Sequence, residues 1–282
     1  MSPPRHIARP SLNWAGFALD RPLIMGIVNA TPDSFSDGGR RADSRDAIAA
    51  GLAMAADGAD IIDVGGESTR PGAIPVPPEV EQARVLPVIR TLAAEGVCVS
   101  ADTRNASTMR AALEAGARIV NDVSALAHDK LAAGVVVEHA CPVVLMHMRG
   151  TPETMLSLAV YDDVVAEVRA ELTQRIDAAI QAGVRPDRIA IDPGFGFAKR
   201  SKHSAAVLRQ LSDLVSLGYP VLAGLSRKSL IGALTDETDA RRRLPGSIAA
   251  ELFAVQQGAA ILRVHDVMET VQALRVWRAL AE

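Results

Sequence analysis

Polar side chains suited to ligand binding stand where apolar runs of this sequence end. Asparagine, aspartate, arginine, lysine and histidine supply the donors, acceptors and charges that orient a small polar ligand. In chain order these positions are Asn29, Glu67 with Thr69 and Arg70, Asp102, Asn121 with Asp122, His147, Asp192, Ser226 with Arg227 and Lys228, and Arg263 with His265. Arg263 and His265 are two apart in an apolar run, a spacing that places both side chains on one face of a strand.

Two of these clusters indicate what kind of ligand to expect. The segments SRKS (226–229) and RVH (263–265) gather cations and hydroxyls where barrels often hold phosphate, which suits an anionic, phosphorylated substrate. The segment DPGFGF (192–197) fixes Asp192 ahead of a rigid proline and two glycines. Acceptors held in this way suit a flat heterocycle that presents several N–H donors.

Eight apolar runs are the elements that must position these side chains. They are continuous rather than alternating, as in parallel strands covered on both faces, and helical patterns separate most of them. The predicted strands are 22–29, 59–66, 97–103, 118–124, 142–148, 188–194, 220–226 and 260–266. Eight strand-then-helix units predict a single-domain (β/α)₈ barrel (TIM barrel), whose active site lies at the carboxyl ends of the strands. An open doubly wound sheet is the alternative, but the sequence has neither GxGxxG nor a Walker loop.

The barrel is expected to span residues 22–282. Residues 1–21 form an N-terminal segment in which LNWAGFALDR (12–21) is expected to make a hairpin that closes the barrel floor. The net charge of −3 and the pI of about 6.1 favour a small-molecule ligand over nucleic acid or an anionic membrane. The N-terminus lacks a signal-like apolar region and no run reaches membrane length, so we expect a cytoplasmic protein. Cys98 and Cys141 are expected to be buried thiols.

Two long loops follow the first two predicted strands. They are ATPDSFSDGGRRA (30–42) and ESTRPGAIPVPP (67–78), which together are rich in glycine, proline, serine and aspartate. We interpret them as lids with glycine hinges. Phe35 is the one aromatic residue of the first loop, and we expect it to shield the reacting centre from water.

The motifs together closely resemble those of the dihydropteroate synthases, a pterin-binding family of folate biosynthesis. The resemblance covers residue 22 to the end and rests on IVNATPDSFSDGG, ADIIDVGGESTRPGA, NDVSAL, LMHMRGTPETM, DPGFGFAK, GLSRKSLIGALT and GSIAAELFAVQQGAAILRVHDV. It implies a transferase that joins 6-hydroxymethyl-7,8-dihydropterin diphosphate to p-aminobenzoate and releases diphosphate. It also implies Mg²⁺ as the cofactor, sulfonamides as competitors of p-aminobenzoate, and a homodimer.

The resemblance further implies a role for each matching residue. The pterin would be held by Asp102, Asn121, Asp192, Lys228, Met146 and Phe197. The diphosphate would be held by Asn29, Arg263 and His265, with Asn29 also a ligand of Mg²⁺, and these three with Lys228 would be the catalytic residues. The p-aminobenzoate and the lids would involve Asp33, Phe35, Thr69, Arg70, Pro71, Lys228 and Ser229.

The residue chemistry agrees with this reaction. An aryl amine is a weak nucleophile and diphosphate a good leaving group, so the main task is to stabilise negative charge on the departing oxygens. Two departures from the family pattern are Ala30, where valine is common, and Ser204, where asparagine is common. We interpret Ser204 as an N-cap of the helix after the sixth strand. His147 is expected to be a packed, hydrogen-bonded residue that supports the site.

Two alternative functions remain at this stage. A barrel that binds a reduced pterin for methyl transfer would not need the Phe35 lid or the STRPG loop (68–72), and both are present. A non-catalytic homologue that binds pterin or regulates a partner is expected to have lost Arg263, His265 or Lys228. All three residues are present here.

Overall fold

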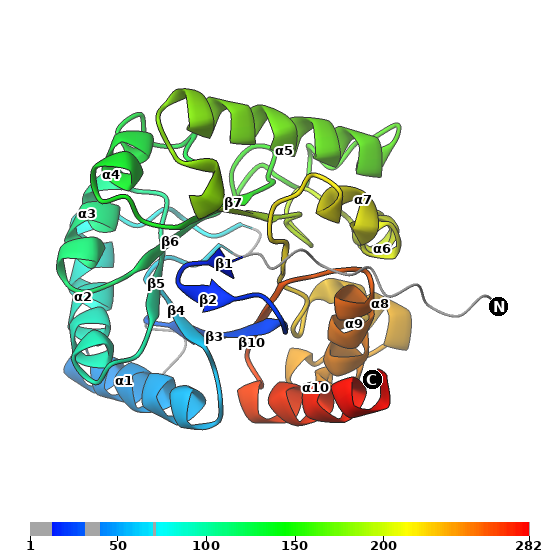
Figure 1. Cartoon of the computed structure of the whole chain (residues 1–282), viewed down its shortest axis with the longest axis horizontal. Helices are drawn as coiled ribbons and strands as arrows, with labels where there is room; N and C mark the ends of the chain where they lie inside the picture. Colours follow the sequence, from blue (N-terminus) through cyan, green and yellow to red (C-terminus); the bar gives the residue numbers. More distant parts are fainter. Residues whose placement is uncertain (1–12, 32–39, 70–71, 282) are drawn as a thin grey trace.

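The chain folds as the predicted (β/α)₈ barrel. The computed structural model describes residues 13–31, 40–69 and 72–281, without the side chains of 40–43 and 281. Within this part of the chain, eight parallel strands are ringed by helices (Figure 1). The strands are β3 (Leu23–Asn29), β4 (Ile61–Gly65), β5 (Val99–Asp102), β6 (Ile119–Asp122), β7 (Val143–Met146), β8 (Ile189–Asp192), β9 (Leu222–Ala223) and β10 (Ile261–Val264).

The sheet closes on itself, which rules out the open doubly wound alternative. Its strand order is β8-β7-β6-β5-β4-β3-β10-β9. The first and last strands of this order, β8 and β9, are joined by a parallel bridge between Ile191 and Val221. The Ile191 N–H also donates to the Pro220 carbonyl at 2.9 Å. Every pair of neighbours is parallel, so all carboxyl ends lie on one side of the barrel.

The strand register sets the level of the predicted site residues. Asn29 pairs with Gly65, Gly65 pairs with Asp102, and Asp102 pairs with Asn121. On the other side of the barrel, Met146 pairs with Asp192. These positions therefore lie at the carboxyl ends of six neighbouring strands.

The helices cover the outer face of the sheet, as Figure 1 shows. Asp163 caps the helix after β7, because its Oδ1 accepts from the N–H groups of Val165 and Ala166 at 3.0 and 3.1 Å. Gly183 follows that helix with a φ of 102°, a conformation that glycine adopts without strain. The helices are α1 (Arg40–Ala56), α2 (Pro78–Ala94), α3 (Ala106–Glu114), α4 (Ala132–Glu138), α5 (Val164–Gln181), α6 (Ser201–Arg209), α7 (Leu211–Val215), α8 (Ser229–Thr235), α9 (Leu244–Gln256) and α10 (Val267–Ala281). No helix of the described residues is both long and apolar enough to cross a membrane.

A small hairpin precedes the barrel, at the position that the sequence suggests. Its strands are β1 (Asn13–Trp14) and β2 (Phe17–Ala18), which pair antiparallel. Trp14 is 1% exposed and packs in a cluster with residues near the amino ends of the barrel strands, such as Leu23 and Ile261. Its indole N–H donates to the Arg188 carbonyl at 3.0 Å. The hairpin thus lies against the amino ends of the strands, and the carboxyl ends remain available for a site.

Candidate active site

An ion network lies at the centre of the carboxyl-end face. Arg263 on β10 donates from Nε to Asp63 Oδ2 and from Nη2 to Asp102 Oδ2, each at 2.7 Å. Asn121 on β6 donates from Nδ2 to the same Asp63 oxygen at 2.9 Å. The structure therefore brings Asp102, Asn121 and Arg263 together, three residues that the sequence assigned to one site.

Asp63 is a member of this network that the sequence analysis missed. It lies in the middle of β4, its side chain is fully buried, and its Oδ1 has no hydrogen-bond partner among the described residues. The polar residues that the sequence points to stand toward the ends of the apolar runs, whereas Asp63 comes earlier, within the run IIDVG. A charged residue inside a buried strand was the available signal, because such a charge needs a partner.

Burial acts in opposite directions on the acids and the base of the network, because it raises the pKa of a carboxyl group and lowers that of a guanidinium group. It raises the pKa of Asp102 to about 7, although the Arg263 charge acts against this shift. Burial alone would lower the pKa of Arg263, but Asp63 and Asp102 outweigh it and the pKa is raised. Arg263 is therefore a permanent cation, whereas Asp102 can exchange a proton near neutral pH.

The loop after β8 forms a second part of the site. Asp192 Oδ1 accepts from the Gly194 N–H at 2.7 Å, which orients the carboxyl group. Lys228 reaches across from the loop after β9, donates to the Phe195 carbonyl, and lies 4.9 Å from the centre of the Phe197 ring. The predicted pterin residues Asp192, Phe197 and Lys228 thus lie together.

Burial also shifts the pKa values of this pair. It raises the pKa of Asp192, against the effect of the nearby Lys228 charge. It lowers the pKa of Lys228 to about 8, and here the Asp192 charge acts in the opposite direction. Each group therefore favours the charged form of the other, and a ligand that contacts both meets a matched acceptor and donor.

Ser204 does not have the capping role that the sequence analysis assigned to it. Helix α6 begins at Ser201, so Ser204 already lies inside its first turn, and it is 1% exposed. Its hydroxyl oxygen instead accepts from the Gly196 N–H at 3.1 Å. The prediction was wrong because the first helical turn faces the loop after β8, and the hydroxyl stabilises that loop.

His265 and Ser226 lie together at the carboxyl ends of the last two strands. Ser226 Oγ lies 3.2 Å from the backbone N of His265 and 3.1 Å from its ring Nδ1. The Ser226 oxygen accepts from the backbone N–H, and its hydroxyl proton can be donated to Nδ1; in that tautomer of His265 the ring proton is on Nε2. Burial lowers the pKa of His265 to about 4, so at neutral pH the ring is an uncharged donor.

Two charged residues from the sequence list have structural partners instead. Arg227 forms an ion pair with Asp266, with its Nε 3.0 Å from Asp266 Oδ2. Glu67 accepts from Arg104 Nε and Nη2 at 3.0 and 2.9 Å, and the Val76 N–H donates to Glu67 at 3.1 Å. Both pairs hold loops at the carboxyl-end face, and neither charge is free for a ligand.

The remaining predicted residues divide into two groups. Met146 is buried at the end of β7, Thr69 is half-buried in the loop after β4, and Ser229 is the exposed first residue of α8. The other group lies outside the described residues and comprises Asp33, Phe35, Arg70 and Pro71.

Asn29 offers a side-chain carbonyl oxygen, a type of ligand that Mg²⁺ accepts. It is the half-buried last residue of β3, and its side-chain amide has no hydrogen-bond partner among the described residues. Those residues contain no group of three or more His, Cys, Asp or Glu side chains that could hold a metal ion. Mg²⁺ often binds only one or two protein oxygens together with substrate phosphates and waters. An ion at Asn29 would therefore take its other ligands from substrate phosphates and waters.

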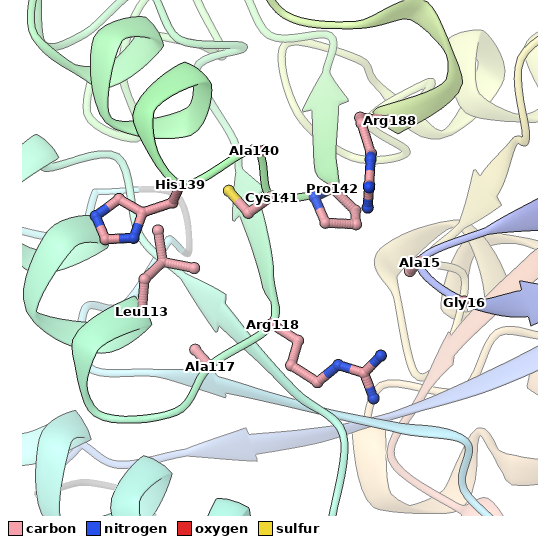
Figure 2. A pocket seen from close by; sticks show the side chains of 10 residues that line it. All are labelled: Ala15, Gly16, Leu113, Ala117, Arg118, His139, Ala140, Cys141, Pro142 and Arg188. Carbon is pink, nitrogen blue, oxygen red and sulfur yellow. The ribbon is translucent and has the colours of Figure 1, made fainter.

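Two cavities of the described residues lie away from this network. One, of about 390 Å³, lies at the amino ends of the strands between Gly16, Arg118 and Arg188 (Figure 2). The other, of about 340 Å³, lies beside Met146, His147 and Glu171. The carboxyl-end network remains the candidate active site, because the predicted side chains converge there and barrel enzymes react at that face.

Comparisons with known proteins agree with this assignment. Residues 25–265 match the family model of the pterin binding enzymes. The dihydropteroate synthase of Neisseria meningitidis serogroup C is 50% identical over 266 residues, which cover 93% of this chain and 94% of that protein. A structure of Xanthomonas albilineans dihydropteroate synthase with 4-aminobenzoic acid has 51% identity and a TM-score of 0.91, with coverage of 97% and 99%. A Yersinia pestis dihydropteroate synthase structure with a sulfonamide drug complex has 40% identity and a TM-score of 0.88, with coverage of 94% and 97%. This chain therefore belongs to the pterin binding enzymes and, among them, to the dihydropteroate synthases.

Proposed function

We propose that this protein condenses 6-hydroxymethyl-7,8-dihydropterin diphosphate with p-aminobenzoate to give 7,8-dihydropteroate and diphosphate. The observation that carries the proposal is the convergence of Asp102, Asn121, Arg263, Asp192 and Lys228 at the carboxyl-end face. Family membership supplies the reaction, and these side chains supply the groups that it needs. The same family membership disfavours the methyl-transfer and non-catalytic alternatives.

The pterin ring would lie between the two acidic parts of the site. Asp192 has one oxygen fixed on the Gly194 N–H, so its other oxygen is available to the ring N–H and amino groups. Asn121 is oriented by Asp63, which accepts from its amide nitrogen and leaves the amide oxygen for the ligand. Met146 and Phe197 would pack against the ring faces.

The bond that breaks joins the pterin methylene carbon to a diphosphate oxygen. The p-aminobenzoate nitrogen attacks this carbon, the diphosphate leaves with the bonding electron pair, and the amine then loses a proton. Arg263 brings a permanent positive charge and His265 an uncharged donor to the last strand. Donors fixed in advance stabilise charge that develops on the departing oxygens.

Mg²⁺ is part of this proposal as an ion carried by the diphosphate. Asn29 would hold it through its side-chain oxygen, at the end of β3. When bound, the ion would neutralise charge on the phosphate oxygens. A chelator is therefore expected to abolish turnover, and added Mg²⁺ to restore it.

We place the p-aminobenzoate beside Thr69, Lys228 and Ser229. The other residues that the sequence assigns to this substrate, among them Phe35 and Arg70, lie outside the described residues. Sulfonamides resemble p-aminobenzoate in shape and charge, and we propose that they compete for the same place. The Yersinia pestis structure with a sulfonamide drug complex supports this proposal.

One assay tests the proposed reaction. The protein is mixed with the pterin diphosphate, p-aminobenzoate and Mg²⁺, and the release of diphosphate is followed together with the formation of dihydropteroate. We expect stoichiometric amounts of both products, which depend on all three additions. Diphosphate release that is independent of p-aminobenzoate, or no release at all, would overturn the proposal.

The homodimer and the cytoplasmic location also belong to the proposal. Exposed apolar side chains on two of the last helices, α8 and α10, support a dimer, with Leu234 on α8 at 69%, Val276 on α10 at 57% and Leu280 on α10 at 84% exposure. Light scattering after size-exclusion chromatography measures the mass in solution. Cell fractionation tests the location.

A further inference from the structure

Lys199 is a buried lysine that the proposed reaction does not use. It follows the loop after β8 and is only 2% exposed. Its Nζ lies 2.7 Å from His147 Nδ1, 3.2 Å from the Gly194 carbonyl oxygen and 3.2 Å from the Phe197 carbonyl oxygen. An ammonium group has three N–H donors, so each has an acceptor, and none of these acceptors is a carboxylate.

His147 connects this lysine to an acid at the outer side of the barrel. Since Lys199 donates to Nδ1, the ring proton lies on Nε2, which is 3.0 Å from Glu171 Oε2. Burial lowers the pKa of His147 to about 4, so the ring is neutral. Arg149 in turn donates from Nε to Glu171 Oε1 at 3.0 Å. The chain Glu171–His147–Lys199 is thus fully hydrogen-bonded, with one tautomer of the histidine.

The acid also helps to keep the lysine charged. Burial lowers the pKa of Lys199 to about 7, and the negative charges of Asp192 and Glu171 oppose this shift. The hydrogen bond from His147 is the largest cause that lowers the pKa of Glu171, to about 2, so the acid is ionised at neutral pH. A neutral amine on Lys199 has only two N–H donors for three acceptors, and one hydrogen bond would be lost.

The two carbonyls that Lys199 holds belong to the backbone of the loop that carries Asp192. The Gly194 N–H orients the Asp192 carboxyl group at 2.7 Å. Gly194 itself has a φ of 68°, and a Cβ at this position would collide with the His147 carbonyl oxygen. The loop therefore packs directly against the end of β7. Its position depends on Lys199, which donates to the Gly194 and Phe197 carbonyls.

We propose that Lys199 is a positioning residue for the pterin. Its ammonium group, linked through His147 to Glu171, holds residues 194–197 in the conformation that presents Asp192 and Phe197 to the ring. This inference rests on the proposed function, because it assigns the loop to pterin recognition. It predicts that changes at Lys199 and at the distant Glu171 weaken the same binding event.

The first test compares Lys199→Met with Lys202→Met. Methionine keeps the length of the side chain and removes its donors, and Lys202 is an exposed lysine on α6 that serves as the matched control. Calorimetry at pH 6.5 with 6-hydroxymethylpterin measures affinity at the loop without the diphosphate. We expect Lys199→Met to bind roughly 10-fold to 100-fold more weakly, because hydrogen bonds from a charged donor are lost. The control should bind within about twofold of the wild type, the usual range for an exposed substitution.

The second test uses Glu171→Gln, alone and combined with Lys199→Met. Glutamine keeps the shape of Glu171, so this variant also decides the question if Lys199→Met does not fold. We expect Glu171→Gln to bind 6-hydroxymethylpterin roughly 3-fold to 10-fold more weakly than the wild type. In the double variant the loss of affinity should be smaller than the product of the two single losses, because both substitutions act through His147. Nitrogen-15 spectra of the imidazole should show the proton on Nε2 in the wild type and a changed signal in both single variants.

The outcomes separate this inference from the proposed reaction. Pterin binding does not require turnover, so weaker binding in both variants supports the role of Lys199 even if the wild type forms no dihydropteroate. If the wild type is active but Lys199→Met binds the pterin as tightly as the wild type, the inference is wrong. Effects of Lys199→Met and Glu171→Gln that multiply in the double variant would also overturn it, because they would show two independent contributions.

Discussion

Arg263 Nη2 lies 2.7 Å from Asp102 Oδ2 and thereby ties the last barrel strand, β10, to β5. The same guanidinium contacts Asp63 on β4, which is fully buried. One cation thus holds two carboxylates at the centre of the site. It neutralises charges that burial would otherwise make costly.

Replacement of Arg263 by alanine should affect catalysis more than pterin binding. Charge builds on the diphosphate only as the bond breaks, so the contribution of the arginine is largest in the transition state. We expect kcat to fall by roughly 100-fold to 1,000-fold, the usual effect of removing one donor that stabilises developing charge. Steady-state kinetics measure this effect, with the exposed Arg275→Ala on α10 as the control. A rise in KM with unchanged kcat would identify Arg263 as a ground-state anchor instead.

Replacement of Asp192 by asparagine should weaken pterin binding with little change in fold. The amide oxygen of the new asparagine can still accept from the Gly194 N–H. Its NH₂ group then faces the ligand, and a donor stands where the ligand needs an acceptor. Each lost charge-assisted hydrogen bond is worth roughly 1.5–3 kcal/mol, or about 10-fold to 100-fold in affinity. Calorimetry with a pterin analogue measures the loss, and circular dichroism checks the fold. Unchanged affinity would remove Asp192 from the site.

Replacement of Asp63 by asparagine should reduce stability as well as pterin affinity. Asp63 Oδ2 accepts from both Asn121 and Arg263, and the neutral amide removes the charge that Arg263 faces. We expect a loss of about 3 kcal/mol in the free energy of unfolding, near the low end for breaking a buried ion pair. Urea unfolding measures it, with Asp177→Asn on the exposed side of α5 as the control. Equal unfolding free energies in the two variants would contradict this account.

Glu251 should make the stability of the protein depend on pH. It is 2% exposed on α9, and burial raises its pKa to about 8. The Thr270 hydroxyl lies 3.1 Å from Glu251 Oε2 and 2.8 Å from the Asp266 carbonyl oxygen. With a single proton it can donate to only one of them, and a protonated Glu251 satisfies both contacts.

The sign of this effect follows from the raised pKa. The folded state retains a proton that the unfolded state releases above its ordinary pKa, so the contribution to stability is lost as the pH rises toward about 8. Glu251→Gln carries no such proton, and its free energy of unfolding should exceed that of the wild type by roughly 1–3 kcal/mol at pH 9. Urea unfolding at pH 5, 7 and 9 measures the difference. A difference that does not change with pH would show that Glu251 is ionised in the folded state.

The location of the site could be predicted from the sequence because a parallel barrel places all strand ends on one face. The continuous apolar runs identified the strands, and the polar residues that end them, such as Asp102, Asn121 and Asp192, lie at the carboxyl-end face in the structure. No knowledge of side-chain contacts was needed for this step. The period and length of the apolar runs determine the strands, and chain direction determines which ends meet.

The partner of each side chain was decided only by the tertiary structure. Arg263 and Asp63 are separated by 200 positions and Lys199 and His147 by 52, so no local pattern links them. Ser204 has the sequence signal of a helix cap, yet its hydroxyl binds Gly196, because α6 begins three residues earlier and turns toward the loop. Sequence alone determined which residue types reach the carboxyl-end face. Register and burial decide which of these residues carry charge, hold the loop or bind each other. The reason is that a buried donor or acceptor pairs with whichever partner the packed barrel places within about 3 Å.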